Sequence, residues 1–298
     1  MHAAVLTFPG HFWQTQLCVR RLCSHYPEIT RISFILDDVD ASPWDEYVSD
    51  FVNCLNLSSD ISRDIHLVTS LKGINFCVAG WWRQQLVKLS LDNILDGHKW
   101  FVVDGDVLFS SRCNVYHKVP ISRRGDHESN WSLMSVNYVR DVLGHGPGYL
   151  TDGNTRVITS PVPFRHLDKL LLSQLRQHVE ARFNDSFIDL HLRWFQDQTI
   201  VADITPPVRW VMTEWELIES YKKYVLAQDW PMLEVGSGYP LDVDITAKQN
   251  GENLFQHSYQ RDSEIGAEWF QSYDVDVRHD VWQRSNDWYN YRERRMRS

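Results

Sequence analysis

The sequence contains four pairs of aspartates separated by one residue, and such pairs could bind a divalent cation. The four pairs are Asp38/Asp40, Asp104/Asp106, Asp242/Asp244 and Asp274/Asp276. Carboxylate oxygens suit Mg²⁺ and Mn²⁺, and a site built on one or two carboxylates leaves coordination positions open for water and phosphate oxygens. A metal bound in this way acts as a Lewis acid and stabilises a leaving diphosphate. Spacing alone does not choose among the four pairs, so the elements around them must decide.

Strands that alternate with helices are predicted over the first hundred residues. Short apolar or β-branched runs predict strands, and apolar residues at helical spacing predict helices. The expected strands span residues 3–8, 32–36, 65–68 and 100–103, and the expected helices span residues 12–23 and 80–95. This alternation predicts an α/β fold with a Rossmann-type, mostly parallel sheet and helices on both faces. Ligands of such sheets bind beyond the carboxyl ends of the strands.

Two of the aspartate pairs follow predicted strands. Asp104/Asp106 comes directly after an apolar strand, and Gly105 between them permits close approach of backbone or ligand. Asp38/Asp40 also follows a strand but lies in a strongly acidic stretch, and the two C-terminal pairs are typical of solvated turns. We therefore expect Asp104/Asp106 to be the pair with a chemical role.

Two further helices are predicted in the second half of the chain. Residues 168–183 place Leu170, Leu171, Leu175 and Val179 on one side of a helix. Residues 213–226 form the other, and Thr213 with Glu216 three residues later is a capping-box pattern. The remainder, from about residue 231, has weak periodicity.

The predicted helix before the Asp104 strand carries an unusual polar face. On a helix, Trp81, Gln85 and Lys88 share one side, and Gln84 also neighbours Lys88. Amide and ammonium donors would then line up beside the strand that carries the carboxylates. An ordinary solvated helix face remains the alternative interpretation.

At this helix the sequence matches the pattern G-W-x-x-Q-Q-x-x-K-L, followed closely by a strand that ends in D-x-D. The matching helix residues are Gly80, Trp81, Gln84, Gln85, Lys88 and Leu89. In this combination the chain resembles one branch of the glycosyltransferases of the GT-A superfamily, and Asp104 and Asp106 match the acidic pair. The joint match is much more specific than either part.

The resemblance is clearest over residues 1–115 and fainter at residues 159–164 and 213–217. In the last segment Thr213, Trp215 and Ile218 stand where similar proteins have Ser, Tyr and a second Tyr. These departures concern the acceptor side more than the donor side.

The resemblance implies one GT-A-like domain over residues 1–298, with a nucleotide-sugar-binding half at 1–115 and an aromatic-rich, acceptor-binding half at 116–298. It implies a metal-dependent hexosyl- or pentosyltransferase that moves a sugar from a nucleoside-diphosphate donor, UDP-linked, to a hydroxyl acceptor such as a glycan or lipid-linked saccharide. Seven of the 13 tryptophans lie after residue 193. Some of them are expected to stack on the acceptor.

The donor and metal residues follow from the same resemblance. Asp104 and Asp106 would bind Mn²⁺ or Mg²⁺, and through it the diphosphate. His257 is the expected third ligand, with His279 as the second choice. Asp37 or Asp38 would lie near the nucleoside. The further donor-binding candidates are Trp81, Arg83, Gln84, Gln85 and Lys88, and of these Lys88 or Arg83 could contact the diphosphate directly.

Two carboxylates are candidates for the catalytic base, which an inverting transferase needs in order to accept the acceptor's hydroxyl proton. Glu214 matches the motif of similar proteins and could instead bind the acceptor. A first-turn acid that favours the helix dipole is its structural alternative. Asp152, in an Asp-Gly turn, is the second candidate.

The net charge of the chain bears on which class of acceptor or partner it binds. The 39 acidic residues against 30 Lys and Arg, a formal charge of -9, disfavour broad binding of duplex nucleic acid. A phage-type transferase that acts on a hydroxylated DNA base would need the basic tail at residues 292–297. A non-catalytic nucleotide-sugar-binding module is the alternative from another class.

The chain also lacks several other signals. Five cysteines without a C-x-x-C pair predict reduced thiols in a cytoplasmic protein, with no zinc site. No signal peptide or membrane span is expected, because no window approaches 18 consecutive apolar residues. Neither a phosphate-binding glycine loop nor a G-x-S-x-G elbow is present, which disfavours P-loop and α/β-hydrolase functions.

Overall fold

A computed structural model provides the structure of the protein for much of the chain. The described residues are 1–36, 55, 58–67, 80–109, 119–124, 130–144, 150–152, 155–159, 164–201, 212–228, 232–234, 243–246, 253–257 and 287. No helix within these segments is long and apolar enough to cross a membrane.

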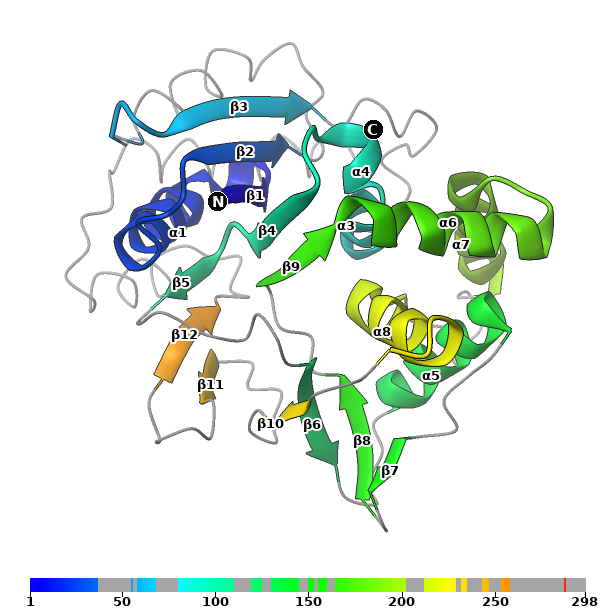
Figure 1. Ribbon diagram of the computed structural model, residues 1–298. Helices are drawn as coiled ribbons and strands as arrows, with labels where there is room; N and C mark the ends of the chain where they lie inside the picture. The colour runs from blue at the N-terminus through cyan, green and yellow to red at the C-terminus, as the bar shows by residue number, and fades with distance from the viewer. Residues whose placement is uncertain are drawn as a thin grey trace.

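The central sheet has five of the described strands, in the order β3-β2-β1-β4-β9 (Figure 1). The first four are mutually parallel: β1 (His2–Thr7), β2 (Arg31–Leu36), β3 (Ser62–Leu67) and β4 (Lys99–Asp104). Strand β9 (Phe164–Asp168) joins β4 antiparallel. Strands β1, β2 and β4 are continuous buried runs, as expected for parallel strands covered on both faces. The predicted α/β fold is confirmed.

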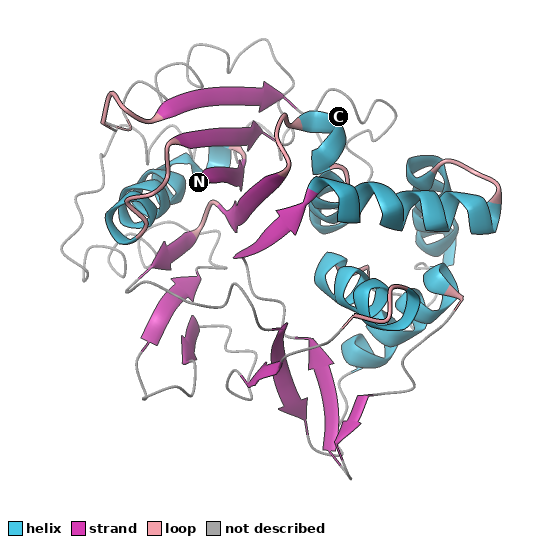
Figure 2. Cartoon of the chain, viewed as in Figure 1, coloured by secondary structure: helices cyan, strands magenta, loops and turns pink. Residues whose placement is uncertain are grey.

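Helices cover both faces of this sheet. On one face, Phe101 of β4 contacts Tyr26, the C-cap residue of α1 (Phe12–His25), with ring centroids 5.2 Å apart. On the other face, Ala4 and Val102 share a core cluster with residues of α3 (Gly80–Leu89), α4 (Leu91–Ile94) and α6 (Lys169–Phe183). Figure 2 shows most of the helices gathered beyond β9, with α1 beside the first strands.

The predicted helix at residues 80–95 is in fact two helices. Helix α3 ends at Leu89, and Ser90 leaves helical geometry while its N–H bonds to the Val87 carbonyl over 3.0 Å. This tighter turn redirects the chain into α4. The prediction of one continuous helix was wrong at this point, because helical spacing of apolar residues continues across a turn that tertiary packing introduces.

Helix α6 begins at Lys169, as its cap residue shows. Asp168 accepts hydrogen bonds from the N–H groups of Leu170 and Leu171, at 2.9 and 3.4 Å. The prediction that Leu170 lies on the buried side of this helix was wrong: Leu170 is 63% exposed, whereas Leu175 and Val179 are buried. Leu170 lies in the first turn, where its neighbours Leu171 and Leu172 face the core instead.

The predicted helix at residues 213–226 changes form midway. Helix α8 (Glu214–Ser220) continues into a π-helical segment, Tyr221–Val225. Thr213 occupies the N-cap but makes no capping hydrogen bond. Its hydroxyl instead lies 2.8 Å from Ser135 Oγ in α5 (Asn130–Leu143). The capping-box prediction was therefore wrong, since a buried hydroxyl partner on a neighbouring helix replaces the local one.

Several elements of the second half had no clear sequence signal. Strands β6 (Val119–Arg124), β7 (Leu150–Asp152), β8 (Thr155–Thr159) and β10 (Met232–Glu234) form a second sheet, in the order β10-β6-β8-β7. The third sheet joins β5 (Val107–Phe109) to β11 (Val243–Thr246) and β12 (Asn253–His257). Helix α7 (Phe187–Val201) packs on α6. Through β9 and β12, the second half pairs directly with β4 and β5.

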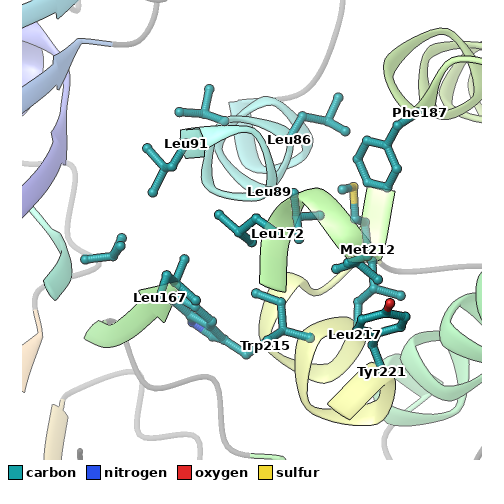
Figure 3. Packing of buried hydrophobic residues seen from close by; sticks show 14 of the residues in the cluster. Leu86, Leu89, Leu91, Leu167, Leu172, Phe187, Met212, Trp215, Leu217 and Tyr221 are labelled. Carbon is teal, nitrogen blue, oxygen red and sulfur yellow. The ribbon is translucent and has the colours of Figure 1, made fainter. Parts of the chain in front are cut away.

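A large apolar cluster fixes α3 relative to α8 (Figure 3). Leu86 and Leu89 come from α3, Leu167 from β9, and Trp215 and Leu217 from α8. All five side chains are buried. Since these helices carry the polar residues of the candidate site, the same cluster positions the site.

Acid is expected to destabilise the fold through His191. Its Nδ1 donates to the Phe187 carbonyl over 2.6 Å, and its Nε2 lies 2.9 Å from the Tyr138 hydroxyl. Burial lowers the pKa of His191 from 6.5 to about 4. The unfolded chain therefore binds the extra proton first, so this contribution to stability is complete above about pH 6.5 and falls by about 1.4 kcal/mol per pH unit towards pH 4.

Urea unfolding between pH 7 and pH 4 measures this slope. His191→Gln should flatten it by about one proton, whereas the same change at exposed His98 should not. Equal slopes in wild type and His191→Gln would contradict the assignment.

Candidate active site

The turn between β4 and β5 holds the Asp104/Asp106 pair at the carboxyl end of a central strand. Both aspartates are buried, and the N–H of Gly105 between them bonds to the Leu6 carbonyl over 2.7 Å. A Cβ at Gly105 would lie 2.5 Å from Thr15 Oγ1 and 2.8 Å from the Leu6 carbonyl oxygen. The expectation that backbone approaches closely at Gly105 is confirmed. Strand β1 and helix α1 therefore contact the acidic turn directly and fix its position.

Gly105→Ala is expected to lower the free energy of unfolding by about 1–3 kcal/mol, the usual range for overpacking. The added methyl group meets the Leu6 carbonyl, which belongs to a rigid central strand. Chemical denaturation measures the loss. An unchanged unfolding free energy would show that the turn is free to move, and would weaken its role as a rigid platform.

The polar face of α3 points at this turn, as predicted from its spacing. Lys88 Nζ lies 2.9 Å from Asp104 Oδ1 and 3.1 Å from Oδ2. Gln84 Nε2 donates to Asp104 Oδ1 over 3.2 Å. Lys88 is itself buried. The first carboxylate of the pair is therefore held by an ammonium and an amide from one helix.

Glu214 joins the same ammonium from the other half of the chain. Its Oε1 lies 2.7 Å from Lys88 Nζ, although the two residues are 126 positions apart. Gln85 lies beside Glu214: the N–H of Glu214 donates to Gln85 Oε1 over 3.5 Å, and with its amide oxygen and nitrogen exchanged Gln85 would donate to the Glu214 carboxylate. Glu214 is the first residue of α8 and is buried. The catalytic candidate Glu214 and the metal candidate Asp104 thus share one cation.

The charges of this cluster stabilise one another. Burial alone would lower the pKa of Lys88, but the negative charges of Asp104 and Glu214 and their hydrogen bonds outweigh it, so the pKa is raised. Lys88 is therefore an ammonium ion throughout the physiological range. Burial and the charge of Glu214 also raise the pKa of the nearby Tyr138 hydroxyl.

A second buried ion pair lies beside the first, and the sequence interpretation missed it. Lys88 Nζ and Arg165 Cζ each lie 5.3 Å from the centroid of the Trp215 ring. Arg165, in β9, donates to Glu219 Oε1 over 2.6 Å. Lys222 Nζ lies 3.0 Å from the same oxygen. An arginine within a short strand and an acid within a helix gave no local signal, since only the fold brings them together.

For the remaining predicted site residues the structure gives the position in the fold but few side-chain contacts. Arg83 is buried in α3, and Trp81 lies in the same helix with its side chain outside the described part. Asp152 ends β7, in a different sheet from Asp104. His257 ends β12, where its backbone pairs with Val107, the residue after Asp106. The register therefore brings position 257 to the acidic turn, as a third ligand would require.

Several candidates lie outside the described residues. These are Asp37, Asp38, His279 and the basic tail at residues 292–297.

The donor set of the acidic turn fits a hard divalent cation. One ammonium, Lys88, and three carboxylates, Asp104, Asp106 and Glu214, give the cluster a formal charge of -2. The carboxylate oxygens of Asp104 and Asp106 are the type of ligand that Mg²⁺ and Mn²⁺ prefer. No group of three or more His, Cys, Asp or Glu close enough to hold a metal occurs among the side chains that the structure describes, and the side chain of His257 is not one of them.

Comparison with known proteins gives structural likenesses only. No family model and no curated protein matches the chain. The galactosyltransferase LgtC in complex with donor and acceptor sugar analogues is similar at 13% identity and a TM-score of 0.34, over 72% of this chain and 84% of that one. An active-site mutant of LgtC gives 14% identity and a TM-score of 0.45, over 96% of this chain and 100% of that one.

A yeast protein is also similar. The mannosyltransferase Ktr4p from S. cerevisiae in complex with GDP gives 10% identity and a TM-score of 0.37, over 60% of this chain and 59% of that one. At these identities and TM-scores a likeness does not transfer an activity. The chemistry of this chain must therefore be argued from its own residues.

Proposed function

We propose that the protein is a metal-dependent glycosyltransferase that moves a sugar from a nucleoside-diphosphate sugar, UDP-linked, to a hydroxyl acceptor. One observation carries the proposal: a buried acidic turn at the carboxyl end of β4, in a mostly parallel sheet, held by Gln84 and Lys88. In α/β sheets this edge is where ligands bind. The resemblance of the α3 motif to GT-A glycosyltransferases supports the same reaction class.

In this proposal Asp104, Asp106 and His257 hold Mn²⁺ or Mg²⁺. When bound, the metal supplies Lewis-acid stabilisation to the departing diphosphate. Gln84 and Lys88 orient the Asp104 carboxylate, because each donates a hydrogen bond to it. Asp37 or Asp38 lies near the nucleoside, and Trp81 and Arg83 complete the donor side.

The acceptor side belongs to the second half of the single domain. Glu214, or Asp152 in its place, accepts the proton of the acceptor hydroxyl in an inverting reaction. For Glu214 the hydrogen bond from Lys88 fixes the direction of the carboxylate. A glycan or lipid-linked saccharide is the acceptor class proposed.

A thermal-shift screen of nucleotide sugars with and without Mn²⁺ tests the function. A true donor at 100 times its dissociation constant should stabilise the protein by about 2.7 kcal/mol. We expect this effect for one UDP-sugar and only with the divalent cation. Absence of stabilisation by every nucleotide sugar, with Mn²⁺ present, would refute the proposal.

Turnover then separates an enzyme from a binding module. The stabilising donor is incubated with glycan, lipid-linked and hydroxylated-base DNA acceptors, and release of the nucleoside diphosphate is measured. Donor binding without release, for all acceptors and in slow hydrolysis, would identify a non-catalytic nucleotide-sugar-binding protein instead.

A further inference from the structure

Lys88 is enclosed by protein to a degree that its predicted role does not require. Its side chain is 3% exposed, and its ammonium lies within 3.1 Å of oxygens of both Asp104 and Glu214. A residue that binds a diphosphate directly would direct its nitrogen at the ligand. Lys88 directs its nitrogen at two carboxylates instead.

The two carboxylates come from parts of the chain that have different proposed tasks. Asp104 ends β4 and belongs to the metal turn, whereas Glu214 begins α8 and belongs to the acceptor side. Their oxygens approach the same nitrogen, so they would repel one another strongly in a buried space without it. The Trp215 ring also lies against the ammonium, with its centroid 5.3 Å away.

These contacts make Lys88 a competitor of the metal. A divalent cation bound to Asp104 would share that carboxylate with an ammonium whose distance to it is already 2.9 Å. Glu214 competes with Asp104 for the ammonium, since it bonds to the same nitrogen at 2.7 Å. The balance between the two ion pairs therefore sets how much negative charge Asp104 offers to the metal.

Resting on the proposed function, we infer that Lys88 is a positioning residue whose ammonium, shared between Asp104 and Glu214, sets the affinity of the metal site and makes it depend on Glu214. Two consequences distinguish this role from direct binding of the diphosphate. Removal of the ammonium strengthens metal binding, and removal of the Glu214 charge weakens it, although Glu214 is not a proposed metal ligand.

Mn²⁺ affinity, measured by the EPR signal of the free ion without any nucleotide, tests the inference. Lys88 bonds directly to the proposed ligand Asp104, and Glu214 bonds to Lys88, so both charges act on the metal site at short range and at least about a tenfold change is expected for each variant. Lys88→Met should bind Mn²⁺ at least about tenfold more tightly, and Glu214→Gln at least about tenfold more weakly. Glu214→Gln keeps the shape and a hydrogen-bonding group, and so decides the question even where Lys88→Met does not fold.

Glu219→Gln is the matched control. Glu219 lies in the same helix as Glu214, is equally buried and also accepts from cations, but these are Arg165 and Lys222 rather than Lys88. Its Mn²⁺ affinity should stay within about twofold of wild type, because its charge lies outside the Lys88 cluster. Equal losses in the two glutamine variants would show a general effect of α8 and would overturn the inference.

The outcomes also separate this inference from the proposed function. Wild type that does not bind Mn²⁺ would refute the metal site, and the inference with it. Wild type that binds Mn²⁺ with unchanged affinity in Glu214→Gln would overturn the inference alone. Weaker binding of UDP by Lys88→Met in EDTA, with unchanged Mn²⁺ affinity, would assign Lys88 to the diphosphate.

Discussion

Asp106→Asn is expected to lower divalent-dependent release of nucleoside diphosphate from the donor by at least about 100-fold, because it removes a proposed metal ligand. The substitution preserves the shape of a buried side chain and removes only its charge. The formal charge of the Lys88 cluster then changes from -2 to -1, which weakens its attraction for a divalent cation. Initial rates with saturating Mn²⁺ and donor measure the loss.

Asp60→Asn is the control for this change. Asp60 is exposed in the turn before β3, so the same substitution should leave the rate within about twofold. A thermal unfolding curve of Asp106→Asn close to that of wild type would show that the loss is chemical. Full activity of Asp106→Asn would remove Asp106 from the metal site.

The largest expected effect on stability comes from Asp92→Ala. Arg176 in α6 forms a two-pronged ion pair with Asp92 in α4, and the distance from Arg176 Nη2 to Asp92 Oδ2 is 2.6 Å. Both residues are buried. Removal of the carboxylate leaves a guanidinium in the interior, so a loss of about 3–5 kcal/mol is expected. Urea unfolding at pH 7 measures it.

Two further variants serve as controls for Asp92→Ala. Arg193→Ala breaks an ion pair with Asp185 whose arginine is more than half exposed, so the loss should stay below about 1 kcal/mol. Asp92→Leu combined with Arg176→Met removes both buried charges and should recover much of the stability that Asp92→Ala loses. A loss below about 1 kcal/mol in Asp92→Ala would show that water reaches Arg176.

The donor side of the fold could be predicted because its signals are local. Strands β1, β2 and β4 are mostly apolar runs closely followed by Pro, Asp or Gly, and their alternation with helices is typical of a buried parallel sheet. Likewise, helical spacing alone placed Gln84 and Lys88 on one face, and the strand that follows supplied their partner, Asp104. Sequence neighbours sufficed for this half of the site.

The other half depends on contacts that no local pattern encodes. Glu214 meets Lys88 only because an apolar cluster packs α8 on α3, and Arg165 meets Glu219 only because β9 joins the central sheet. Tertiary contacts also explain why the continuous helix predicted across Ser90 and the capping box predicted at Thr213 were wrong. In both places a tertiary partner or turn replaced the local structure that periodicity and capping rules favour.

Little in the sequence indicates that β12 pairs with β5. This pairing matters for the proposed metal site, because it positions His257. Periodicity identifies a strand without naming its neighbour, so the position of His257 opposite Val107 had to come from the fold. The resemblance alone proposes His257 as a ligand, and the register places its backbone beside Val107, next to the acidic turn.

Anomalous diffraction at the manganese edge, from crystals grown with Mn²⁺ and UDP, tests the central claim most directly. The account predicts one strong peak about 2–2.5 Å from carboxylate oxygens of the Asp104/Asp106 turn, with the diphosphate oxygens on its open side. A manganese peak elsewhere in the protein, or bound UDP with no peak at this turn, would contradict it.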